Sequence, residues 1–423
     1  MDKKTNFDVI IIGAGPAGLI AGGVSALNGN QTVILEKMDQ PGRKLRITGK
    51  GRCNFTNDID LDTFISHFGA NGNFLRQAFH RFFVKDLINF FDAIGIESVV
   101  ERGGRVFPGN GDASFLTEKL AAWATSSVAE IRPQTSVEKI LSNDGIIEGI
   151  QTRNGERINA PSIVLACGGA SFTGTGSTGD GYAMAKALGH HITPLRPALV
   201  PIRSEDPRTR ELQGLALRNV RATILVNGTQ TREAFGELMF THFGLSGPVI
   251  LTMSGYIVDE LQAGKSVEIS IDLKPALDEK KLDNRLLREF DTSGKTHFQN
   301  ILKSLLPSKM IPVCVTDTRI PAHKPGHQIT QEERSHLLHW LKDLRFKISG
   351  HLPIEAAMIT QGGVSLDAVD PRTMESKLVK GLYFAGEILD LAADTGGFNL
   401  QAAFSTGYVA GENAAKFVTG VSR

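Results

Sequence analysis

The chain has 423 residues, of which 41% are hydrophobic and 22% are charged, with 46 basic and 45 acidic side chains. This length exceeds what one hydrophobic core normally organises, so we expect two or three domains. The balanced charge excludes the overall basic character typical of proteins that bind nucleic acids or anionic membranes. Three cysteines, widely spaced and odd in number, indicate neither a disulfide framework nor a zinc site, and we expect a reducing cytoplasm and no metal centre.

Residues 7–36 predict a strand, a glycine-rich turn, a helix and a second strand that ends in Glu36. In the turn, Gly13 permits a tight bend, Gly15 lets a pyrophosphate approach the backbone, and Gly18 allows close packing of helix and strand. Unpaired N–H groups at the start of the helix favour an anion there. The carboxylate of Glu36 would accept hydrogen bonds from an adenosine ribose. The segment therefore predicts a dinucleotide site.

The run from Val9 to Leu27 lacks charged residues, and its length alone would suit a signal peptide or a membrane helix. Its glycines and Pro16 argue against an apolar anchor, and a second strand continues the fold directly. We expect neither a targeting segment nor a membrane span.

Glycine-rich clusters recur at residues 41–57, 162–189 and 381–415. If they serve one ligand, both ends of the chain form one domain that is interrupted by an insert. Within the insert, residues 197–272 show the short alternating runs of antiparallel strands. Residues 275–340 are charged, with apolar positions at helical spacing.

Two further segments favour FAD over NAD. SIVLACGG (162–169) and GLYFAGE (381–387) each read as a strand that enters a glycine turn, where a backbone can approach a cofactor closely. Gly396 and Gly397 precede a helix whose N-terminal amides suit the N1 and C2 carbonyl edge of a flavin. A second GxGxxG at 174–179 follows no apolar strand and precedes no suitable acid, so we expect no separate NAD domain. NAD(P)H would act only as a transient electron donor.

With these motifs in view, the chain resembles the HI0933-like bacterial flavoproteins, also described as BaiN/RdsA-type FAD-dependent oxidoreductases. Six motifs carry the resemblance in order: GRKLRITGKGRCNFTN (42–57), ERGGRVFP (101–108), GSTGDGYAMAKALGH (176–190), ELMFTHFGLSGP (237–248), TMESKLVKGLYFAGEILD (373–390) and TGGFNLQAAFSTGYVAG (395–411).

The resemblance implies an α/β fold: a Rossmann-like FAD-binding domain with an inserted β-barrel domain, in which a small helical domain is nested. We expect the FAD-binding domain at 1–195 and 352–423, the barrel at 196–274 and 342–351, and the helical domain at 275–341.

The resemblance also implies a range of activities, from reduction of conjugated C=C bonds in steroid-like enones to oxidation of small amino ketones. GDGYAMAKALG, QGGVSLD and GLYFAGE further resemble stretches of fumarate reductase and aspartate oxidase flavoproteins, which favours enone reduction. Residues 171–173 and 391–393 depart from the common family pattern, and we expect them near the flavin or its substrate cavity.

The expected cofactor-binding set combines the fingerprint with the later clusters. Its members are Gly13, Ala14, Gly15, Pro16, Ala17, Gly18, Glu36, Lys37, Arg43, Lys44, Gly51, Arg52, Cys53, Asn54, Val137, Ala166, Cys167, Gly168, Gly169, Gly386, Glu387, Gly396, Gly397, Phe398, Asn399 and Leu400.

Three side chains are candidates for proton transfer. His242, in a loop of the insert, is the preferred one, because a histidine can exchange protons near neutral pH. Tyr182 and Glu387 are lesser candidates, and Glu387 is expected to hold the ribityl chain. Cys53 lacks a partner at CxxC spacing, which favours packing or flavin contact over a redox role.

We therefore expect an FAD-dependent oxidoreductase that transfers hydride between flavin N5 and a small or steroid-like substrate, most simply in NAD(P)H-linked enone reduction. One alternative is an aminoacetone-like amine oxidase that releases hydrogen peroxide. Another is a non-catalytic, redox-sensing or RNA-associated flavoprotein, although RNA is not expected for a chain of balanced charge. The sequence leaves the oligomeric state open.

Overall fold

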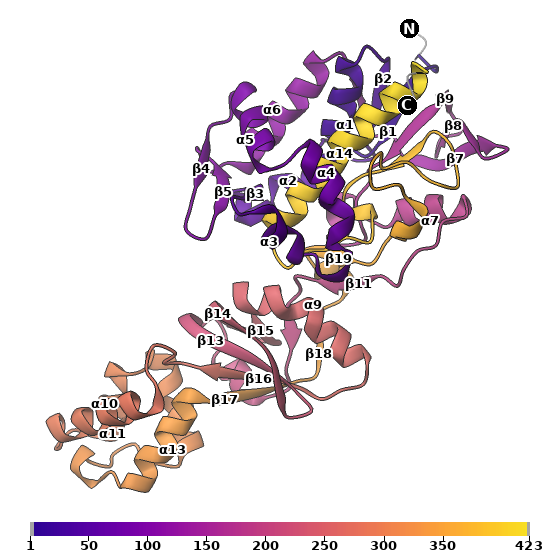
Figure 1. Cartoon of the computed structure of the whole chain (residues 1–423). Helices are drawn as coiled ribbons and strands as arrows, with labels where there is room; N and C mark the ends of the chain where they lie inside the picture. Colours follow the sequence, from indigo (N-terminus) through magenta and orange to yellow (C-terminus); the bar gives the residue numbers. More distant parts are fainter. Residues whose placement is uncertain (1–3, 421–423) are drawn as a thin grey trace. The chain divides into compact units, whose positions relative to one another are not determined.

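The computed structural model describes residues 4–420, which form two compact units (Figure 1). One unit contains the chain up to Ala198 together with the part from Ile354 onward, and the other spans Leu199–Pro353. Both ends of the chain thus share one unit. The further separation of a helical domain at 275–341 stays a prediction.

The first unit is built on a parallel five-stranded sheet of order β20-β10-β1-β2-β6, the Rossmann type that was predicted. Four of its strands are buried along their whole length and strongly apolar, as a sheet covered on both faces requires. The strands are β1 (Val9–Ile12), β2 (Thr32–Leu35), β6 (Glu130–Arg132), β10 (Ser162–Leu165) and β20 (Leu382–Phe384). Because β20 comes from the third glycine cluster, the sheet itself joins the two ends of the chain.

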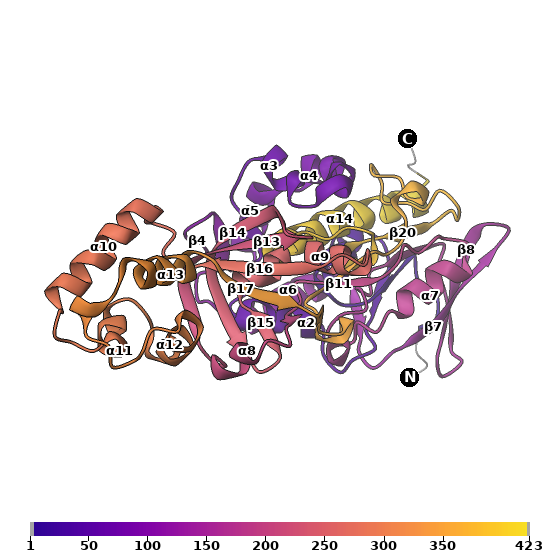
Figure 2. The same ribbon diagram turned by 90° about the horizontal axis from the view of Figure 1, so that it is seen from below.

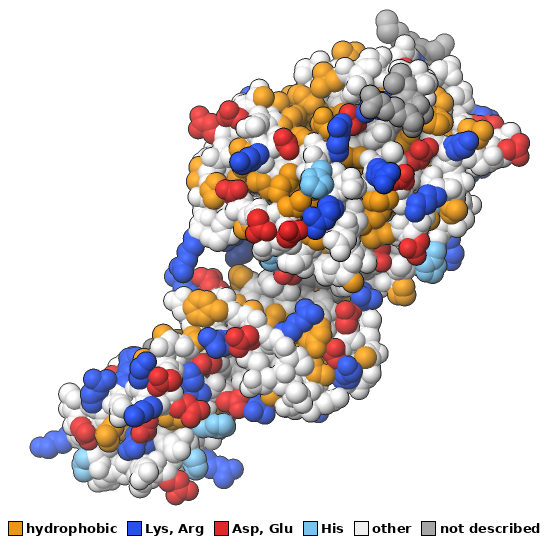
Figure 3. All heavy atoms as spheres, in the orientation of Figure 1, with side chains coloured by type: hydrophobic (Ala, Val, Ile, Leu, Met, Phe, Trp, Pro, Cys, Tyr) orange, Lys and Arg blue, Asp and Glu red, His pale blue; other side chains and the backbone are white. Residues whose placement is uncertain are grey.

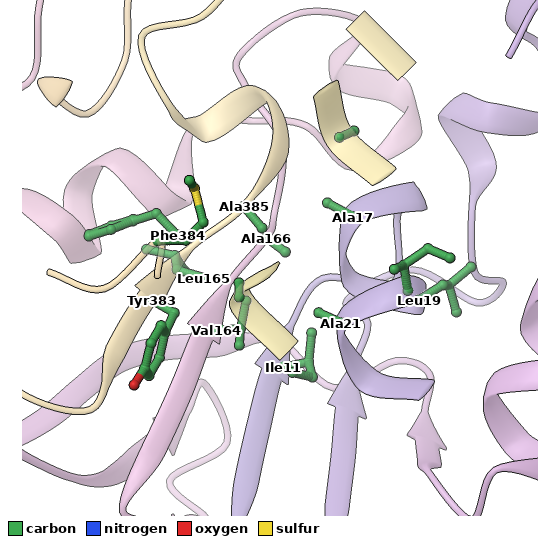
Figure 4. Close-up of a cluster of buried hydrophobic side chains, with 14 of the residues drawn as sticks. Ile11, Ala17, Leu19, Ala21, Val164, Leu165, Ala166, Tyr383, Phe384 and Ala385 are labelled. Atoms are coloured by element: carbon green, nitrogen blue, oxygen red, sulfur yellow. The ribbon is translucent and has the colours of Figure 1, made fainter. Parts of the chain in front are cut away.

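Helices α1 (Pro16–Leu27) and α14 (Gly396–Val418) lie side by side in Figure 1, where α14 is yellow. A Cβ on Gly407 would lie 2.4 Å from the carbonyl oxygen of Ala17, and one on Gly411 would lie 2.3 Å from that of Ala21. Glycines one helical turn apart therefore allow this close approach. Figure 4 shows the buried core beneath, where side chains of β1, β10 and β20 meet those of α1.

The remaining elements of the first unit form three small sheets and peripheral helices. The sheets have the orders β3-β5-β4, β7-β8-β9 and β11-β19. Their strands are β3 (Thr56–Asn57), β4 (Ser98–Val100), β5 (Arg105–Pro108), β7 (Val137–Asn143), β8 (Ile146–Thr152), β9 (Arg157–Asn159), β11 (Arg196–Ala198) and β19 (Ile359–Gln361). The helices are α2 (Arg43–Arg46), α3 (Leu61–Ser66), α4 (Arg76–Arg81), α5 (Val84–Ala93), α6 (Ala113–Ser126) and α7 (Asp180–Ala187).

The second unit contains an antiparallel sheet of order β17-β16-β13-β14-β15-β12-β18. Only Ser349 separates β17 from β18, so one continuous segment pairs with β16 at one end and with β12 at the other. This segment closes the sheet into the predicted barrel. The strands are β12 (Ile202–Arg203), β13 (Ala216–Val226), β14 (Thr229–Thr241), β15 (Gly244–Ser246), β16 (Val267–Asp272), β17 (Leu344–Ile348) and β18 (Gly350–His351).

One prediction for the insert was wrong in part, because residues 197–272 are not all strands. Helix α9 spans Pro248–Gln262 within this stretch (Figure 2). Pro248 occupies its first turn, where a missing N–H costs nothing, and Val249, Met253 and Ile257 recur at helical spacing on a buried face. The other helices are α8 (Pro207–Glu211), α10 (Glu279–Thr292), α11 (Phe298–Ile301), α12 (Ile311–Thr318) and α13 (Gln331–Lys342).

Candidate active site

Three glycines have different roles in the turn between β1 and α1. Gly13 adopts φ +104° against the backbone of Ala166, and a Cβ on Gly18 would lie 1.8 Å from the carbonyl oxygen of Gly13. These two glycines are therefore required by the fold. Around Gly15, the N-cap of α1, nothing lies within 4 Å of an added Cβ. The backbone is thus open at a helix N-terminus, where N–H groups and the helix dipole favour an anion such as a pyrophosphate.

Glu36 follows β2 directly, so the strand ends one residue earlier than predicted, at Leu35. Its Oε2 accepts a hydrogen bond of 2.9 Å from the N–H of Ala14, and its Oε1 accepts one of 2.9 Å from the N–H of Met38. Burial raises the pKa of this carboxyl, against the effect of these bonds. The carboxylate is therefore fixed beside the glycine turn, and its remaining lone pairs can accept ribose hydroxyls.

Lys37 connects the first glycine cluster to the second. Its Nζ donates to Oγ1 of Thr178 at 2.5 Å and to Oδ2 of Asp180 at 2.7 Å. Burial opposes ionisation of Asp180, but the bonds from Lys37 and Thr178 outweigh it and lower the pKa of this carboxyl. Thr178 and Asp180 thus bind Lys37 at the end of the segment 174–179. The absence of a second nucleotide site there stays a prediction.

Lys44, Ser171 and Glu387 form a polar cluster that joins all three glycine-rich regions. Nζ of Lys44 lies 2.7 Å from Oε2 of Glu387 and 2.7 Å from Oγ of Ser171. Oγ of Ser171 donates to Oε1 of Glu387 at 2.9 Å, and the same oxygen accepts from the N–H of Thr360 at 2.8 Å. Sequence reasoning did not single out Thr360, although it directly precedes the segment QGGVSLD (361–367).

Asn54 faces the start of α14. A Cβ on Gly397 would lie 2.6 Å from Nδ2 of Asn54, whereas an added Cβ on Gly396 would meet nothing within 4 Å. Oδ1 of Asn54 is buried and has no hydrogen-bond partner within residues 4–420. Such a group normally has a partner, so the oxygen indicates a ligand with an N–H or O–H donor at this point. An open helix terminus beside an orphaned acceptor fits a flavin ring.

The neighbouring Cys53 lies at φ +57° and is fully buried. Burial raises the pKa of its thiol to about 12. Cys167, at the end of the strand that leads into the second cluster, also has its pKa raised by burial, to about 12. Both thiols therefore stay protonated at neutral pH, which suits packing or cofactor contact rather than thiolate chemistry.

Other members of the expected cofactor-binding set have partners outside the cradle that Gly15, Asn54 and Gly396 form. Arg43 pairs with Asp39 at 3.2 Å on the surface. Arg52 pairs with Glu101 at 2.6 Å, and its guanidinium lies 4.4 Å from the ring centre of Phe107. The roles of Arg43 and Arg52 in cofactor binding stay predictions, as do the roles of Gly51, Val137 and Leu400.

The two predicted catalytic side chains, Tyr182 and His242, belong to different units. Tyr182 is buried, its hydroxyl donates to the carbonyl oxygen of Glu387 at 3.3 Å, and burial raises its pKa above the usual range. His242 is exposed in the turn between β14 and β15 of the second unit. Tyr182 thus contacts the backbone of Glu387, a member of the polar cluster. The catalytic roles of Tyr182 and His242 stay predictions.

A histidine that sequence reasoning missed lies at the cradle instead. Nδ1 of His67 lies 2.8 Å from Oδ1 of Asp394, and its ring stacks on Phe398 with centroids 3.8 Å apart. The two members of the pair are 327 positions apart, so no local spacing could have revealed them. The only signal was the departure from the family pattern at 391–393, directly before Asp394.

A cavity of about 270 Å³ is lined in part by the residues that directly follow this histidine in the chain. Its lining includes residues 68–71, Thr193, Gly362 and Asp390. The carboxamide of Asn71 donates to the carbonyl oxygen of Asp390 at 2.8 Å and ties the two walls together. This is large enough for a small ring system.

Two negative findings apply to the described part of the chain. Residues 4–420 contain no helix that is long and apolar enough to cross a membrane. Within the same range, no cluster of three or more His, Cys, Asp or Glu side chains could hold a metal ion.

Comparisons with known proteins match this chain over nearly its whole length. A family model described as the HI0933-like protein Rossmann domain matches residues 7–413. A 3-dehydro-bile acid delta(4,6)-reductase of Clostridium scindens is 30% identical over 409 residues, covering 96% of this chain and 98% of its own. A ribosomal RNA dihydrouridine synthase of Escherichia coli K12 is 31% identical over 410 residues, with the same coverage.

Among solved structures, a 3-ketosteroid-Δ4-(5α)-dehydrogenase of Rhodococcus jostii RHA1 shares the fold with a TM-score of 0.53. It is 15% identical, and the alignment covers 98% of both chains. The open backbone at Gly15 and Gly396 and the unpartnered oxygen of Asn54 fit FAD. The chain therefore belongs to the HI0933-like Rossmann family, and it is an FAD-dependent oxidoreductase.

Proposed function

We propose that this enzyme reduces a carbon–carbon double bond that is conjugated with a carbonyl group. One observation carries the proposal. Two relatives of nearly equal similarity and coverage are named as a delta(4,6)-reductase of a 3-dehydro bile acid and as a dihydrouridine synthase. In a 3-oxo steroid and in uracil alike, the bond that such an enzyme saturates is conjugated with a carbonyl. The shared bond change, rather than a shared substrate, supports the reaction type.

FAD, when bound, supplies the hydride, and the protein supplies orientation and electrostatics. We propose that the open turn at Gly15 holds the pyrophosphate and that Glu36 holds the ribose. The flavin ring would lie at Asn54 and at the start of α14. NAD(P)H would reduce the cofactor transiently, since we expect no second nucleotide domain.

We propose a small or steroid-like enone as the first substrate class. Of the charged side chains, 46 are basic and 45 acidic, and on the face in Figure 3 both signs are interspersed. Protein surfaces that bind polyanions usually concentrate basic residues instead. A free enone needs only an apolar cavity with a few polar groups.

Reduction of uridine in ribosomal RNA is the second candidate. It is favoured by the relative of that name in Escherichia coli and by a second one in Haemophilus influenzae, which is 30% identical over 404 residues. Uracil is itself a conjugated carbonyl compound. Both candidates would therefore use the same site chemistry, and they differ in how the substrate is held.

The test is an anaerobic half-reaction experiment with the purified FAD-loaded protein. Flavin absorbance should bleach on mixing with NADH or NADPH and should return on adding a substrate of the correct class. The panel contains a 3-oxo-Δ4 steroid, ribosomal RNA that lacks dihydrouridine, and a series of amines. Return of absorbance with the steroid, and a product that has gained two hydrogen atoms, would support the first class. The same result with RNA alone would establish the second.

A different pattern would overturn the proposal. Bleaching by an amine but not by a nicotinamide, with peroxide released on admission of oxygen, would identify an amine oxidase. A reduced protein that no conjugated acceptor reoxidises would contradict reduction of a double bond.

A further inference from the structure

His67 has its ring fixed in two independent ways. It lies directly after α3, and its Nδ1–H donates to Oδ1 of Asp394 at 2.8 Å. One face of the imidazole stacks on Phe398, with centroids 3.8 Å apart and planes 17° apart. An imidazole that is held by a carboxylate at Nδ1 has its tautomer set and keeps Nε2 for proton exchange.

Asp394 is itself held rigidly. The side chain of Asn399, on the first turn of α14, accepts from the N–H of Ala393 at 3.0 Å. Its Nδ2 donates to the carbonyl oxygens of Ala393 at 3.0 Å and Thr395 at 2.8 Å. The loop that carries Asp394 is thus tied to the same helix turn that begins with Gly396 beside Asn54. The pair is therefore attached to the proposed flavin cradle by short, bonded segments.

The side chain of His67 also has the access that proton transfer needs. Its exposed fraction is 29%, and Nε2 has no hydrogen-bond partner within residues 4–420. The chain continues from His67 into residues 68–71, which line the cavity of about 270 Å³. His67 is therefore the residue directly before the cavity-lining segment, and its ring stacks on the first turn of α14.

Asp394 is the charged side chain that contacts His67 directly. On the packed elements, Asp62 of α3 and Arg76 of α4 pair with each other at 2.7 Å. Asp390 lines the cavity from the segment that precedes the loop of Asp394. Phe398 on α14 is neutral. The carboxylate of Asp394 is thus the acidic group in direct contact with the imidazole.

We propose that His67 is the proton donor of the reaction and that Asp394 is its positioning residue. The inference rests on the proposed function, reduction of a conjugated double bond. Hydride from reduced FAD, itself reduced by a nicotinamide, forms a C–H bond at the β-carbon, and the electron pair of the double bond moves into an enolate. The Nε2–H bond of the imidazolium then breaks, and the proton forms a C–H bond at the α-carbon. The carbonyl is restored, and water returns the proton to His67.

The test separates proton donation from folding and from flavin reduction. His67→Phe keeps an aromatic ring to stack on Phe398 but removes the transferable proton. His67→Gln is a second, polar variant, and His80→Gln, at an exposed position on α4, is the matched control. The FAD-loaded variants are reduced anaerobically by a nicotinamide and then mixed with the enone or RNA acceptor that reoxidises the wild type.

We expect flavin reduction to be unchanged in all variants and reoxidation to slow by about 10²- to 10⁴-fold in both His67 variants, the range for loss of a general acid. In a third variant, His67→Ala, added imidazole should partly restore the rate of flavin reoxidation. A purely structural role of His67 would not allow this rescue. Asp394→Asn should lower the reoxidation rate with little effect on the acceptor concentration that gives half the maximal rate.

A second readout does not depend on turnover. In ¹⁵N NMR spectra of the oxidised FAD-loaded protein, the saturated product should shift the Nε2 signal of His67 and leave that of His80 unchanged. If the wild type reduces an acceptor and His67→Phe reoxidises equally fast, or if the Nε2 signal does not move, the role of His67 is refuted. If the wild type reduces no conjugated acceptor, the proposed function itself fails.

Discussion

Lys44 and Glu387, 343 positions apart in the chain, form an ion pair of 2.7 Å that joins the first and third glycine-rich regions. Both side chains are mostly buried, with exposed fractions of 24% and 17%. Lys44→Met should lower the free energy of unfolding of the FAD-free protein by about 1 to 3 kcal/mol, because it leaves the carboxylate of Glu387 without its cation. Urea unfolding followed by circular dichroism measures this loss.

The control for this variant is Arg43→Met. Arg43 pairs with Asp39 at 3.2 Å where both side chains are exposed, so its loss should cost less than about 1 kcal/mol. In a double-mutant cycle, Glu387→Gln should recover part of the loss from Lys44→Met. Strict additivity of the two changes would contradict a direct interaction.

Substitution by alanine should lower stability at Gly18 and FAD affinity at Gly15. Gly18→Ala should cost about 3 kcal/mol of stability, because its Cβ would overlap the carbonyl oxygen of Gly13. Gly15→Ala should change stability by less than about 1 kcal/mol, since φ is −78° and the space is open. Its FAD affinity should nonetheless fall about tenfold or more, a loss of about 1.4 kcal/mol, because the Cβ occupies the approach to the backbone.

Unfolding of the FAD-free proteins and fluorescence titration with FAD distinguish these effects. Unchanged FAD affinity in Gly15→Ala would show that the pyrophosphate lies elsewhere.

The cysteines should resist alkylation in the folded protein. Burial raises the pKa of Cys53 and Cys167 to about 12, which lowers their thiolate fraction about 10³-fold relative to an exposed cysteine near neutral pH. The pKa of Cys314 is also raised by burial. Mass spectrometry after iodoacetamide treatment should find three labelled thiols only after denaturation. Rapid labelling of Cys53 in the folded protein would instead indicate a reactive thiol.

His190 should make the protein less stable in acid. Its side chain is buried, and burial lowers its pKa although Nδ1 contacts the carbonyl oxygen of Ala185. Below about pH 6.5 the unfolded chain takes up a proton at this site that the folded protein resists, so stability falls as pH falls. His190→Gln should therefore lose less stability than the wild type between about pH 7.5 and about pH 5.5.

Urea unfolding at the two pH values gives the comparison, and His80→Gln, at an exposed position, should keep the pH dependence of the wild type. An equal loss in His190→Gln and the wild type would show that this histidine does not couple to folding.

Several features of the fold followed from local patterns. Strand β1, the turn at Gly13 and helix α1 were predictable because a parallel β-α-β unit needs a buried apolar strand and glycines at fixed spacing. Helices α10 and α13 followed from apolar positions at helical spacing. Helix α9 was missed because its sequence is apolar on much of its surface, so that its period does not stand out from buried strands.

The sequence by itself determined the cofactor fold, because the strand, glycine turn, helix and acid of residues 7–36 form one continuous unit. The later glycine-rich segments and the family resemblance indicated FAD. Only the tertiary structure decided which distant side chains meet: Lys44 with Glu387, Asn54 with Gly397, and His67 with Asp394. Each of these pairs joins segments more than 300 positions apart, which come together because β20 pairs with β10 in the sheet and α14 packs on α1. Contacts of this kind depend on how the elements pack, and no local spacing encodes them.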